Sequence, residues 1–227
     1  FSFRSFYKMK KYILSFVAMF FCAVLGAQKI TTAGDFFKTI SDYYATIHDY
    51  EVDADISIGK QKMQGKVSFK RPEMLRIDFT DPAEQVLLFN GDMLTIYLPG
   101  SQAILEQSVD KNGATAATVQ GLNLMRRYYT IAYESGQDSV PLDEGSDEMV
   151  VNLMLYSRST SEAFSTIRLS ISPDEKLIRR VVATTAQNET YTFDFYNYNL
   201  NTNMTDQRFI YDPPSSANTY NNFLFAE

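Results

Sequence analysis

The chain has 227 residues, of which 27 are acidic and 21 are Lys or Arg, so its formal net charge is −6 at pH 7. A negative chain disfavours binding to nucleic acid and to anionic membrane surfaces. One cysteine and one histidine are too few for a disulfide within the chain or for a zinc site of Cys and His ligands.

The first part of the chain has the pattern of a secretory signal peptide. Residues 9–28 read MKKYILSFVAMFFCAVLGAQ, in which two lysines precede the apolar run 12–25 and the small residues Gly26 and Ala27 follow it. We therefore predict that residues 1–27 are removed after Ala27 and that the protein is exported to a bacterial periplasm. An uncleaved membrane anchor is the alternative, but the apolar run is shorter than the roughly 20 residues that span a bilayer.

We expect that the mature chain, residues 28–227, carries no lipid of its own. Cys22 follows Phe21, whereas a lipoprotein-processing site has a small residue at that position. The mature chain keeps all 27 acidic residues and 17 of the 21 Lys and Arg, so its net charge is 17 − 27 = −10. Its length of 227 − 27 = 200 residues suffices for a single domain with a sizeable core.

An amphipathic helix is predicted directly after the signal peptide. Residues 31–47 place apolar side chains at helical spacing, and Thr31 or Thr32 precedes them as the capping residue. Such a helix buries its apolar face against the rest of a domain.

Strand patterns follow the helix, because apolar residues then recur at every second position. They cover residues 52–58, 67–69 and 75–79. The dipeptide Asn90-Gly91 between VLLF and MLTIYL predicts a hairpin.

The middle of the chain departs from this rhythm. Residues 113–135, GATAATVQGLNLMRRYYTIAYES, are interpreted as one or two short helical turns. Strand patterns resume in MVVNLMLYS, STIRLSIS, KLIRRVVATT and ETYTFDFYNYN, with turns at residues 172–174 and 187–188. A last strand is predicted at residues 208–211, RFIY.

These patterns predict a mainly β fold with a few helical elements. About ten or eleven strands with short connections are typical of an antiparallel meander, in which alternation leaves one face of the sheet apolar. Two helical segments are available to cover that face. The space beneath them is either a packed core or a ligand cavity, and periodicity fits both.

The sequence offers few catalytic residues. His48 follows the predicted helix, where we expect it to be solvated or to cap the helix, and a Ser-His-Asp triad has only this histidine to use. The sequence has no phosphate-binding glycine loop and no nucleophile elbow. The acidic cluster Asp143, Glu144, Asp147 and Glu148 lacks the spacing of a calcium loop and indicates a solvated hairpin tip. We therefore expect neither an enzyme nor a metal site.

One stretch carries a family resemblance. Residues 69–99, FKRPEMLRIDFTDPAEQVLLFNGDMLTIYLP, run as a strand, an Arg-Pro, an apolar strand, a Pro and a hairpin that leads to an aromatic strand. This order resembles the signature of the periplasmic lipoprotein carriers of the LolA family. The features at the family's spacing are Arg71-Pro72, Pro82, Asn90-Gly91, Tyr97 and Glu106-Gln107. RFIYDPPSS near the end is similar to the family's final strand, so the resemblance covers about residues 28–216.

The resemblance implies an unclosed antiparallel β-barrel whose apolar face is covered by helices acting as a lid. It implies a monomeric chaperone without a cofactor, which binds the acyl chains of lipoproteins and carries them from the inner to the outer membrane. Its partners are then an inner-membrane ABC transporter that supplies the lipoproteins and an outer-membrane acceptor that receives them.

The resemblance also implies residue roles. Arg71 is expected to donate to backbone carbonyls of the lid, placed between Ala114 and Tyr129, and to hold the empty cavity closed as a latch. A solvated arginine beside a strand-edge proline is the alternative. The acyl-chain cavity is expected to be lined by Leu75, Ile77, Phe79, Ile96, Phe36 and Ile40. The inner face of the lid is expected to consist of Leu122, Leu124 and Met125.

Other functions fit the same pattern. One is a sensor of lipoproteins, or a general lipid-binding protein of the same fold, and another is an enzyme that acts on a hydrophobic molecule in the cavity. A membrane-anchored acceptor of the same pathway requires a lipidated cysteine at the mature start, where Gln28 stands. The tail, residues 218–227, is apolar enough to dock on the barrel or on a partner.

Overall fold

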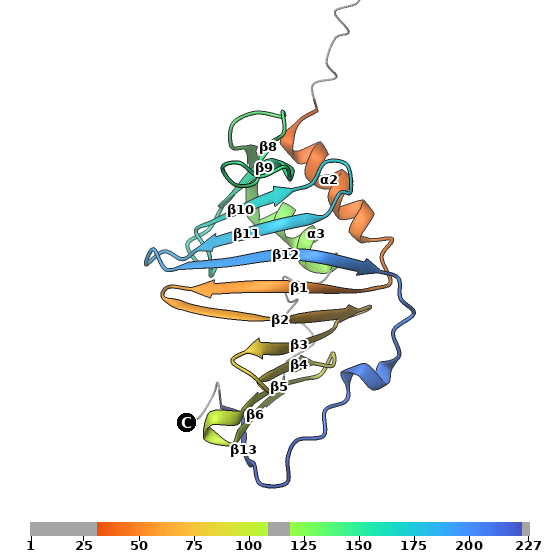
Figure 1. Ribbon diagram of the computed structural model, residues 1–227. Coiled ribbons are helices and arrows are strands. Elements are labelled where there is room, and N and C mark those ends of the chain that lie inside the picture. The colour runs from red at the N-terminus through yellow and green to blue at the C-terminus, as the bar shows by residue number, and fades with distance from the viewer. Residues whose placement is uncertain (1–30, 109–118, 224–227) are drawn as a thin grey trace, which may run out of the picture. The chain divides into compact units, whose positions relative to one another are not determined.

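The computed structural model describes residues 31–108 and 119–223 (Figure 1). The predicted signal peptide lies outside these residues. Thr32–Glu227 form one compact unit, and its main element is a 13-stranded β-sheet.

The first half of the sheet consists of strands that pair with their neighbours in chain order. They are β1 (Asp49–Ile58), β2 (Gln61–Lys70), β3 (Met74–Asp81), β4 (Val86–Phe89), β5 (Met93–Leu98) and β6 (Ala103–Ser108). A 3₁₀ turn, η2 (Pro99–Ser101), joins β5 to β6. The side-chain oxygen of Asn90 accepts a hydrogen bond of 2.9 Å from the backbone N of Met93, so the predicted hairpin is confirmed.

The second half of the sheet joins the first through β1. It consists of β7 (Tyr129–Tyr133), β8 (Val140–Pro141), β9 (Met149–Ser157), β10 (Thr166–Ile171), β11 (Ile178–Thr184) and β12 (Thr190–Leu200). The last strand, β13 (Asn218–Asn221), pairs with β6 of the first half. The strand order is β13-β6-β5-β4-β3-β2-β1-β12-β11-β10-β9-β7, and β8 pairs with β9. Since β13 and β7 end this order, the sheet is not closed, and the predicted unclosed barrel is confirmed.

Two helices cover the apolar face of the sheet. In α2 (Ala33–Tyr44) the hydroxyl of Thr32 accepts from the backbone N of Asp35 at 3.1 Å, which confirms the predicted cap. The second helix is α3 (Val119–Tyr128). Apolar side chains of both helices pack with β7, β9, β10 and β11 in one buried cluster, which includes Phe37 and Leu153.

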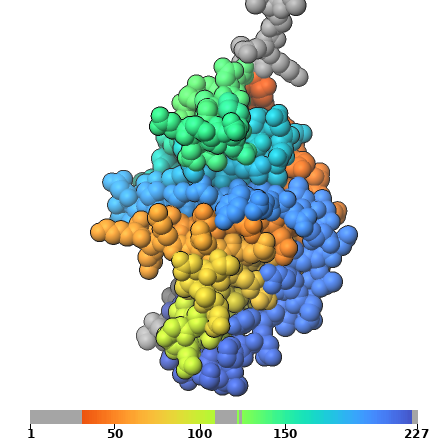
Figure 2. Space-filling model, viewed as in Figure 1, coloured from red at the N-terminus to blue at the C-terminus, as the bar shows by residue number. Residues whose placement is uncertain are grey.

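A C-terminal strap, residues 201–221, runs from the end of β12 past one end of the strands β1 to β5 and then to β6 (Figures 1 and 2). Its contacts with Arg76 and Asp78 lie on the outer face of the sheet, opposite the helices. At the start of the strap, the buried carboxylate of Asp49 accepts two hydrogen bonds of 2.7 Å from Thr202. Its 3₁₀ turn, η3 (Asp206–Phe209), places Phe209 in an apolar cluster with residues of β4, β5 and β6.

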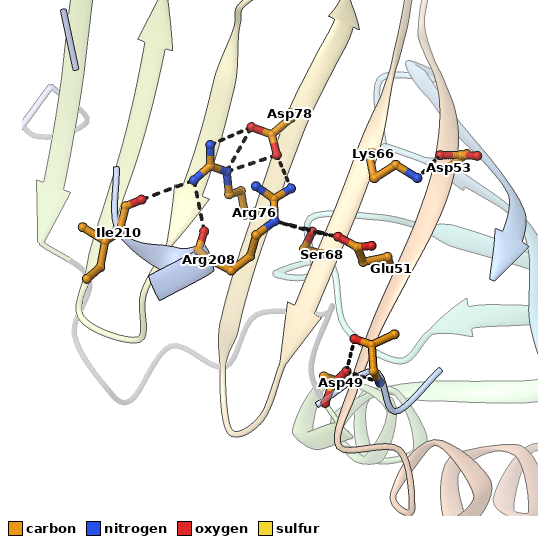
Figure 3. Close-up of polar contacts among 10 residues, drawn as sticks. Asp49, Glu51, Asp53, Lys66, Ser68, Arg76, Asp78, Arg208 and Ile210 are labelled. Carbon is orange, nitrogen blue, oxygen red and sulfur yellow. Dashed lines mark hydrogen bonds and ion pairs between the residues drawn. The ribbon is translucent and has the colours of Figure 1, made fainter. Parts of the chain in front are cut away.

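Charged side chains fix the middle of the strap to β3 (Figure 3). Arg76 forms hydrogen bonds to Asp78 and to the carbonyl of Arg208, at 2.8 and 3.0 Å. The guanidinium of Arg208 in turn reaches Asp78 and, at 3.2 Å, Ser68 of β2. The end of the strap, β13, pairs in parallel with β6, so this part of the predicted tail docks on the sheet.

Two predictions of local structure are wrong. Residues 208–211 form no strand, because the chain leaves the sheet after β12 and forms η3, which packs Phe209 onto the outer cluster. Residues 129–133 are not helical but form the edge strand β7, in which the side chains of Tyr129, Ile131 and Tyr133 pack against the core cluster under the helices. The alternation of apolar residues in this strand is hard to recognise in the sequence, because a helix directly precedes it.

Candidate functional site

An apolar cavity of about 270 Å³ lies between the helices and the central strands. Side chains of the α2 end and of α3 form one wall, and β1, β2, β3, β10, β11 and β12 form the other. The lining residues are Tyr44, Ile47, Tyr50, Ala54, Ile56, Val67, Phe69, Leu75, Ile77, Leu122, Met125, Leu169, Ile178, Val181, Phe193, Phe195 and Tyr198. Apart from three hydroxyls and one thioether these side chains are hydrocarbon, so the cavity suits an apolar ligand.

Four of the residues expected at the site line this cavity. Leu75 and Ile77 reach it from β3, in which they alternate with outward-facing residues of the strap network. Leu122 and Met125 reach it from α3, where a spacing of three puts them on one face of the helix. The side chain of Leu124 is outside the described part of the structure.

The two residues expected from α2 lie elsewhere. Ile40 is 1% exposed and belongs to the cluster that packs the helix onto the sheet. Phe36 packs against that cluster, and its ring centroid lies 6.2 Å from that of Tyr133. Helical periodicity identified the buried face of α2 correctly, but this face is filled, and the cavity begins only at the end of the helix with Tyr44.

The other two expected strand residues also lie outside the cavity lining. Phe79 is 8% exposed and fills a cluster with Ile56 and Val67. Ile96 of β5 pairs with Leu87 of β4, and Leu87 pairs with Ile77 of β3. Ile96 therefore lies on the cavity face of the sheet, but two strands away from Ile77. The alternation of apolar residues predicted correctly which face of the sheet Ile96 lies on, but it does not indicate how far the cavity extends.

Three aromatic residues of β12 were missed by the sequence analysis. Phe193 and Phe195 lie two positions apart and therefore on the same face of β12. Continued alternation would put residue 197 on this face next and would put Tyr198 on the opposite face. The strand has a bulge, with a register shift opposite Val52 and with Asn197 at φ 57°, so Tyr198 returns to the cavity face. An asparagine within an aromatic strand was the available signal, because asparagine tolerates this conformation better than most residues.

Arg71 holds the end of α2. Its Nε donates to the carbonyl of Ile47 at 2.7 Å and its Nη2 donates to the carbonyl of Tyr44 at 3.0 Å. Its backbone N also donates to the carbonyl of His48 at 3.0 Å. Carbonyls at a helix end lack partners within the helix and attract cations, and α2 has no basic residue in its own last turn. Arg71 supplies that charge from the turn between β2 and β3.

The described acceptors of the Arg71 side chain differ from the expected ones. The carbonyls were expected between Ala114 and Tyr129, of which residues 114–118 lie outside the described residues, whereas both described acceptors lie at the end of α2 and in the turn that follows it. Arg71 does donate to backbone carbonyls of a covering helix. The helix is the first of the two because the β2–β3 turn lies beside the α2–β1 connection.

Three tyrosines, Tyr44, Tyr50 and Tyr198, meet at one end of the cavity and are called the tyrosine triad here. The hydroxyl of Tyr44 accepts from the backbone N of Ile178 at 2.9 Å and lies 3.5 Å from the hydroxyl of Tyr198. Tyr198 donates to the carbonyl of Ile178 at 2.8 Å. Burial raises the pKa of each of the three hydroxyls, so all three stay protonated at neutral pH.

A second, polar groove of about 510 Å³ opens beside the end of α2. Two of its charged residues are cations: Arg179 donates to Glu148 and Glu175 at 2.9 and 2.7 Å, and Lys176 lies over the ring of Tyr43. Both cations already have partners within the chain, so the groove presents no site as clear as the apolar cavity.

Two carboxylates of the predicted acidic hairpin tip, Asp143 and Glu148, have partners within the chain. Asp143 pairs with Arg180 at 2.7 Å, which holds the pKa of the carboxyl below its usual value, and Glu148 pairs with Arg179. His48 is exposed, and its backbone N donates to the side chain of Asn201. Within the described residues, no group of three His, Cys, Asp or Glu side chains is placed to hold a metal ion.

An open sheet that encloses an apolar cavity under two helices defines a protein that binds apolar ligands. The chain belongs to the LolA family: its residues 55–212 match the family model described as outer membrane lipoprotein carrier protein LolA. Among the residues that the structure describes, neither helix has the length and apolar character needed to cross a bilayer.

Sequence relatives carry the same description. An outer-membrane lipoprotein carrier protein of Pseudomonas aeruginosa is 23% identical over 157 residues, which cover 68% of this chain and 69% of the relative. The protein of the same description from Pseudomonas paraeruginosa has the same identity and coverage.

Solved structures share the fold at low sequence identity. An uncharacterized conserved protein from Thermus thermophilus superposes with a TM-score of 0.55 at 12% identity, over 82% of this chain and 97% of that one. MucB superposes with a TM-score of 0.51 at 11% identity, over 79% of this chain and 62% of that one. At these identities the likeness shows the fold alone.

Proposed function

We propose that the protein is a periplasmic chaperone that binds the acyl chains of lipoproteins in the apolar cavity and carries them from the inner to the outer membrane. One observation carries this proposal: a member of the LolA family encloses an apolar cavity under a helix end that Arg71 holds in place. The family description and the named relatives support the choice of lipoproteins as ligands.

The physical need for such a carrier follows from the hydrophobic effect. Each methylene group exposed to water costs about 0.8 kcal/mol, so a multiply acylated lipoprotein does not cross an aqueous compartment unaided. A protein that hides the chains in a hydrocarbon-lined cavity removes this cost. It acts by binding alone and needs neither a catalytic residue nor a cofactor.

The size of the cavity implies that ligand binding moves the helices. Its volume of about 270 Å³ lies below the roughly 300–1,000 Å³ of typical small-molecule sites. Long acyl chains therefore require α2 and α3 to move away from the sheet. Arg71 opposes this movement because its two side-chain hydrogen bonds end on α2 and the following turn, and this is the sense in which we propose that it is a latch.

The same proposal assigns partners at both ends of the path. An inner-membrane ABC transporter supplies the acylated lipoprotein, and an outer-membrane acceptor receives it. The carrier is expected to act as a monomer, with its charged outer face in contact with solvent.

Release of a lipoprotein from spheroplasts tests the proposal. The full chain is expressed in a Gram-negative host, purified, and incubated with spheroplasts that contain a radiolabelled outer-membrane lipoprotein. We expect a soluble one-to-one complex that contains the intact acylated lipoprotein. A matched lipoprotein whose acylated cysteine is replaced by serine provides the control and should not enter the complex.

Two results separate the alternatives. Equal capture of the acylated and non-acylated lipoprotein would show that acyl chains are not what the protein recognises. A folded protein that binds free lipid but releases no lipoprotein would instead indicate a lipid sensor or a general lipid-binding protein.

A further inference from the structure

One hydroxyl of the tyrosine triad has no hydrogen-bond partner among the described residues. Tyr50 lines the cavity from β1, its ring stacks on Phe69 with centroids 5.2 Å apart, and no described side chain or backbone group bonds to its hydroxyl. The side chain is half-buried, and the proton of its hydroxyl is available for donation into a space that is otherwise lined by hydrocarbon. Such a group suits a ligand that provides an acceptor.

Counting protons in the triad identifies a second available donor. Each phenol has one proton, and Tyr198 uses its proton in the bond of 2.8 Å to the carbonyl of Ile178. The hydroxyl of Tyr44 accepts from the backbone N of Ile178, so its own proton points at best to the oxygen of Tyr198 at 3.5 Å. That distance is beyond the usual range for O–H···O bonds. Tyr44 and Tyr50 therefore hold two protons that a ligand is able to accept.

The surroundings favour a neutral acceptor over an anion. The guanidinium of Arg71 is directed to the carbonyls of Tyr44 and Ile47. Arg179 lies 5.6 Å from the ring of Tyr198 but is paired with two glutamates. No described side chain of the cavity lining is charged, and a carboxylate buried there would lack a counter-ion.

We propose that the tyrosine triad is a subsite for the carbonyl oxygen of an ester- or amide-linked acyl chain, with Tyr50 as its main donor. The inference rests on the proposed function and deepens it, because it names the part of the acyl group that is recognised and the direction in which the chain lies. The carbonyl end lies at the triad beside the end of α2, and the hydrocarbon tail extends along Ile56, Leu75 and Ile77.

This arrangement makes the protein selective for acyl groups over plain hydrocarbon. It also connects recognition to the helix end, since Tyr44 provides a donor through its side chain while its backbone carbonyl is held by Arg71. A ligand that engages the triad therefore contacts the element that has to move for longer chains to enter.

The test compares two single-chain ligands that differ in one carbonyl. Methyl dodecanoate and dodecyl methyl ether compete against a fluorescent apolar probe for the full chain and for two variants, Tyr50→Phe and Tyr97→Phe. Tyr50→Phe removes only the hydroxyl and keeps the ring. Tyr97→Phe is the matched control, because Tyr97 is buried in the cluster under the strap and does not line the cavity.

We expect Tyr50→Phe to weaken the ester by roughly 3- to 10-fold and to leave the affinity for the ether within about twofold, since one neutral hydrogen bond is lost only with the ester. Tyr97→Phe should change neither affinity. With a carbonyl-labelled ester, the infrared carbonyl band of the bound ligand should shift to lower frequency, and the shift should be smaller in Tyr50→Phe.

Other results overturn the inference. Equal weakening of both ligands, or no change with either, means that Tyr50 has a structural role or none, and acyl binding itself stands. If neither ligand displaces the probe from the unmodified protein, the proposed function fails, and the subsite fails with it.

Discussion

The guanidinium of Arg71 donates from Nε to the backbone carbonyl of Ile47 at 2.7 Å, across 24 positions of sequence. This bond connects the turn after β2 to the turn after α2, so a strand turn fixes the end of a covering helix. Every bond that stabilises the helix in its position on the sheet lowers the affinity for a ligand whose entry displaces the helix.

The first prediction concerns Arg71→Leu. The change removes two hydrogen bonds to backbone carbonyls and destabilises the closed state, and a typical intramolecular hydrogen bond contributes about 0.5–1.5 kcal/mol. We expect long-chain acyl ligands to bind roughly 5- to 100-fold more tightly and to be passed to an acceptor more slowly. Displacement of a fluorescent acyl probe and transfer of a labelled lipoprotein measure the two effects.

Lys70→Leu is the control for this change. Lys70 is the neighbouring cation, and it pairs with Asp206 of the strap instead of with α2. It should leave both affinity and transfer near those of the unmodified protein. Normal transfer by Arg71→Leu would contradict the latch.

A second prediction concerns the cavity wall. Ile77→Trp places a large side chain into a space of about 270 Å³ and should lower the affinity for acyl ligands at least tenfold. Thr80→Trp, on the exposed side of the same strand, is the matched control and should bind normally. Equal binding by both variants would mean that ligands do not occupy the cavity beside β3.

The sheet and its helical cover were predictable because they depend on local pattern. Alternation in β1 to β5, the Asn90-Gly91 hairpin and the Thr32 cap each follow from a few neighbouring residues. The strap was not predictable in the same way. Its position depends on contacts such as Arg208 with Asp78, which are 130 positions apart and leave no periodic signal.

The candidate site was predictable only in part for a similar reason. The alternation of apolar residues predicts which side chains face the helices, so Leu75, Ile77 and also Ile96 were assigned to the correct face. It does not predict where neighbouring side chains fill the space between the helices and the sheet. The family resemblance directed attention to Arg71, but the identity of its acceptors depends on how two turns meet in three dimensions.

The third prediction tests the strap. Phe209 is 3% exposed, and Phe209→Ala leaves a cavity in the outer cluster that should cost about 3–5 kcal/mol of unfolding free energy. Ile210→Ala is the control, because the neighbouring side chain is 59% exposed and its removal should change stability by no more than about 0.5 kcal/mol. Urea unfolding measures both. A cost below about 1 kcal/mol for Phe209→Ala would show that the strap does not pack on the sheet in solution.

The last prediction concerns pH and the outer face of β1. The carboxylate of Asp53 accepts from Lys66 at 2.7 Å and from Asn197 at 2.9 Å, and these hydrogen bonds, that of Lys66 first, lower the pKa of the carboxyl below its ordinary value of 3.8. A carboxyl whose folded pKa is lowered adds stability above its ordinary pKa, and this stability is lost as the pH falls through the folded pKa. Because the Lys66 side chain is 46% exposed, the contribution at pH 7 is at most about 1 kcal/mol.

Asp53→Asn should therefore be less stable than the unmodified protein at pH 7, and the difference should shrink as the pH falls below the ordinary pKa of 3.8, because the unfolded chain then binds the proton more readily than the folded one. Urea unfolding at pH 7 and at pH 3 gives the comparison. Asp81→Asn, at an exposed aspartate that ends β3, is the control and should show a small difference at both. If the stability difference for Asp53→Asn were the same at pH 7 and at pH 3, the ionised carboxylate would not be what stabilises this pair of strands, and packing of the Lys66 side chain over β1 would be the better account.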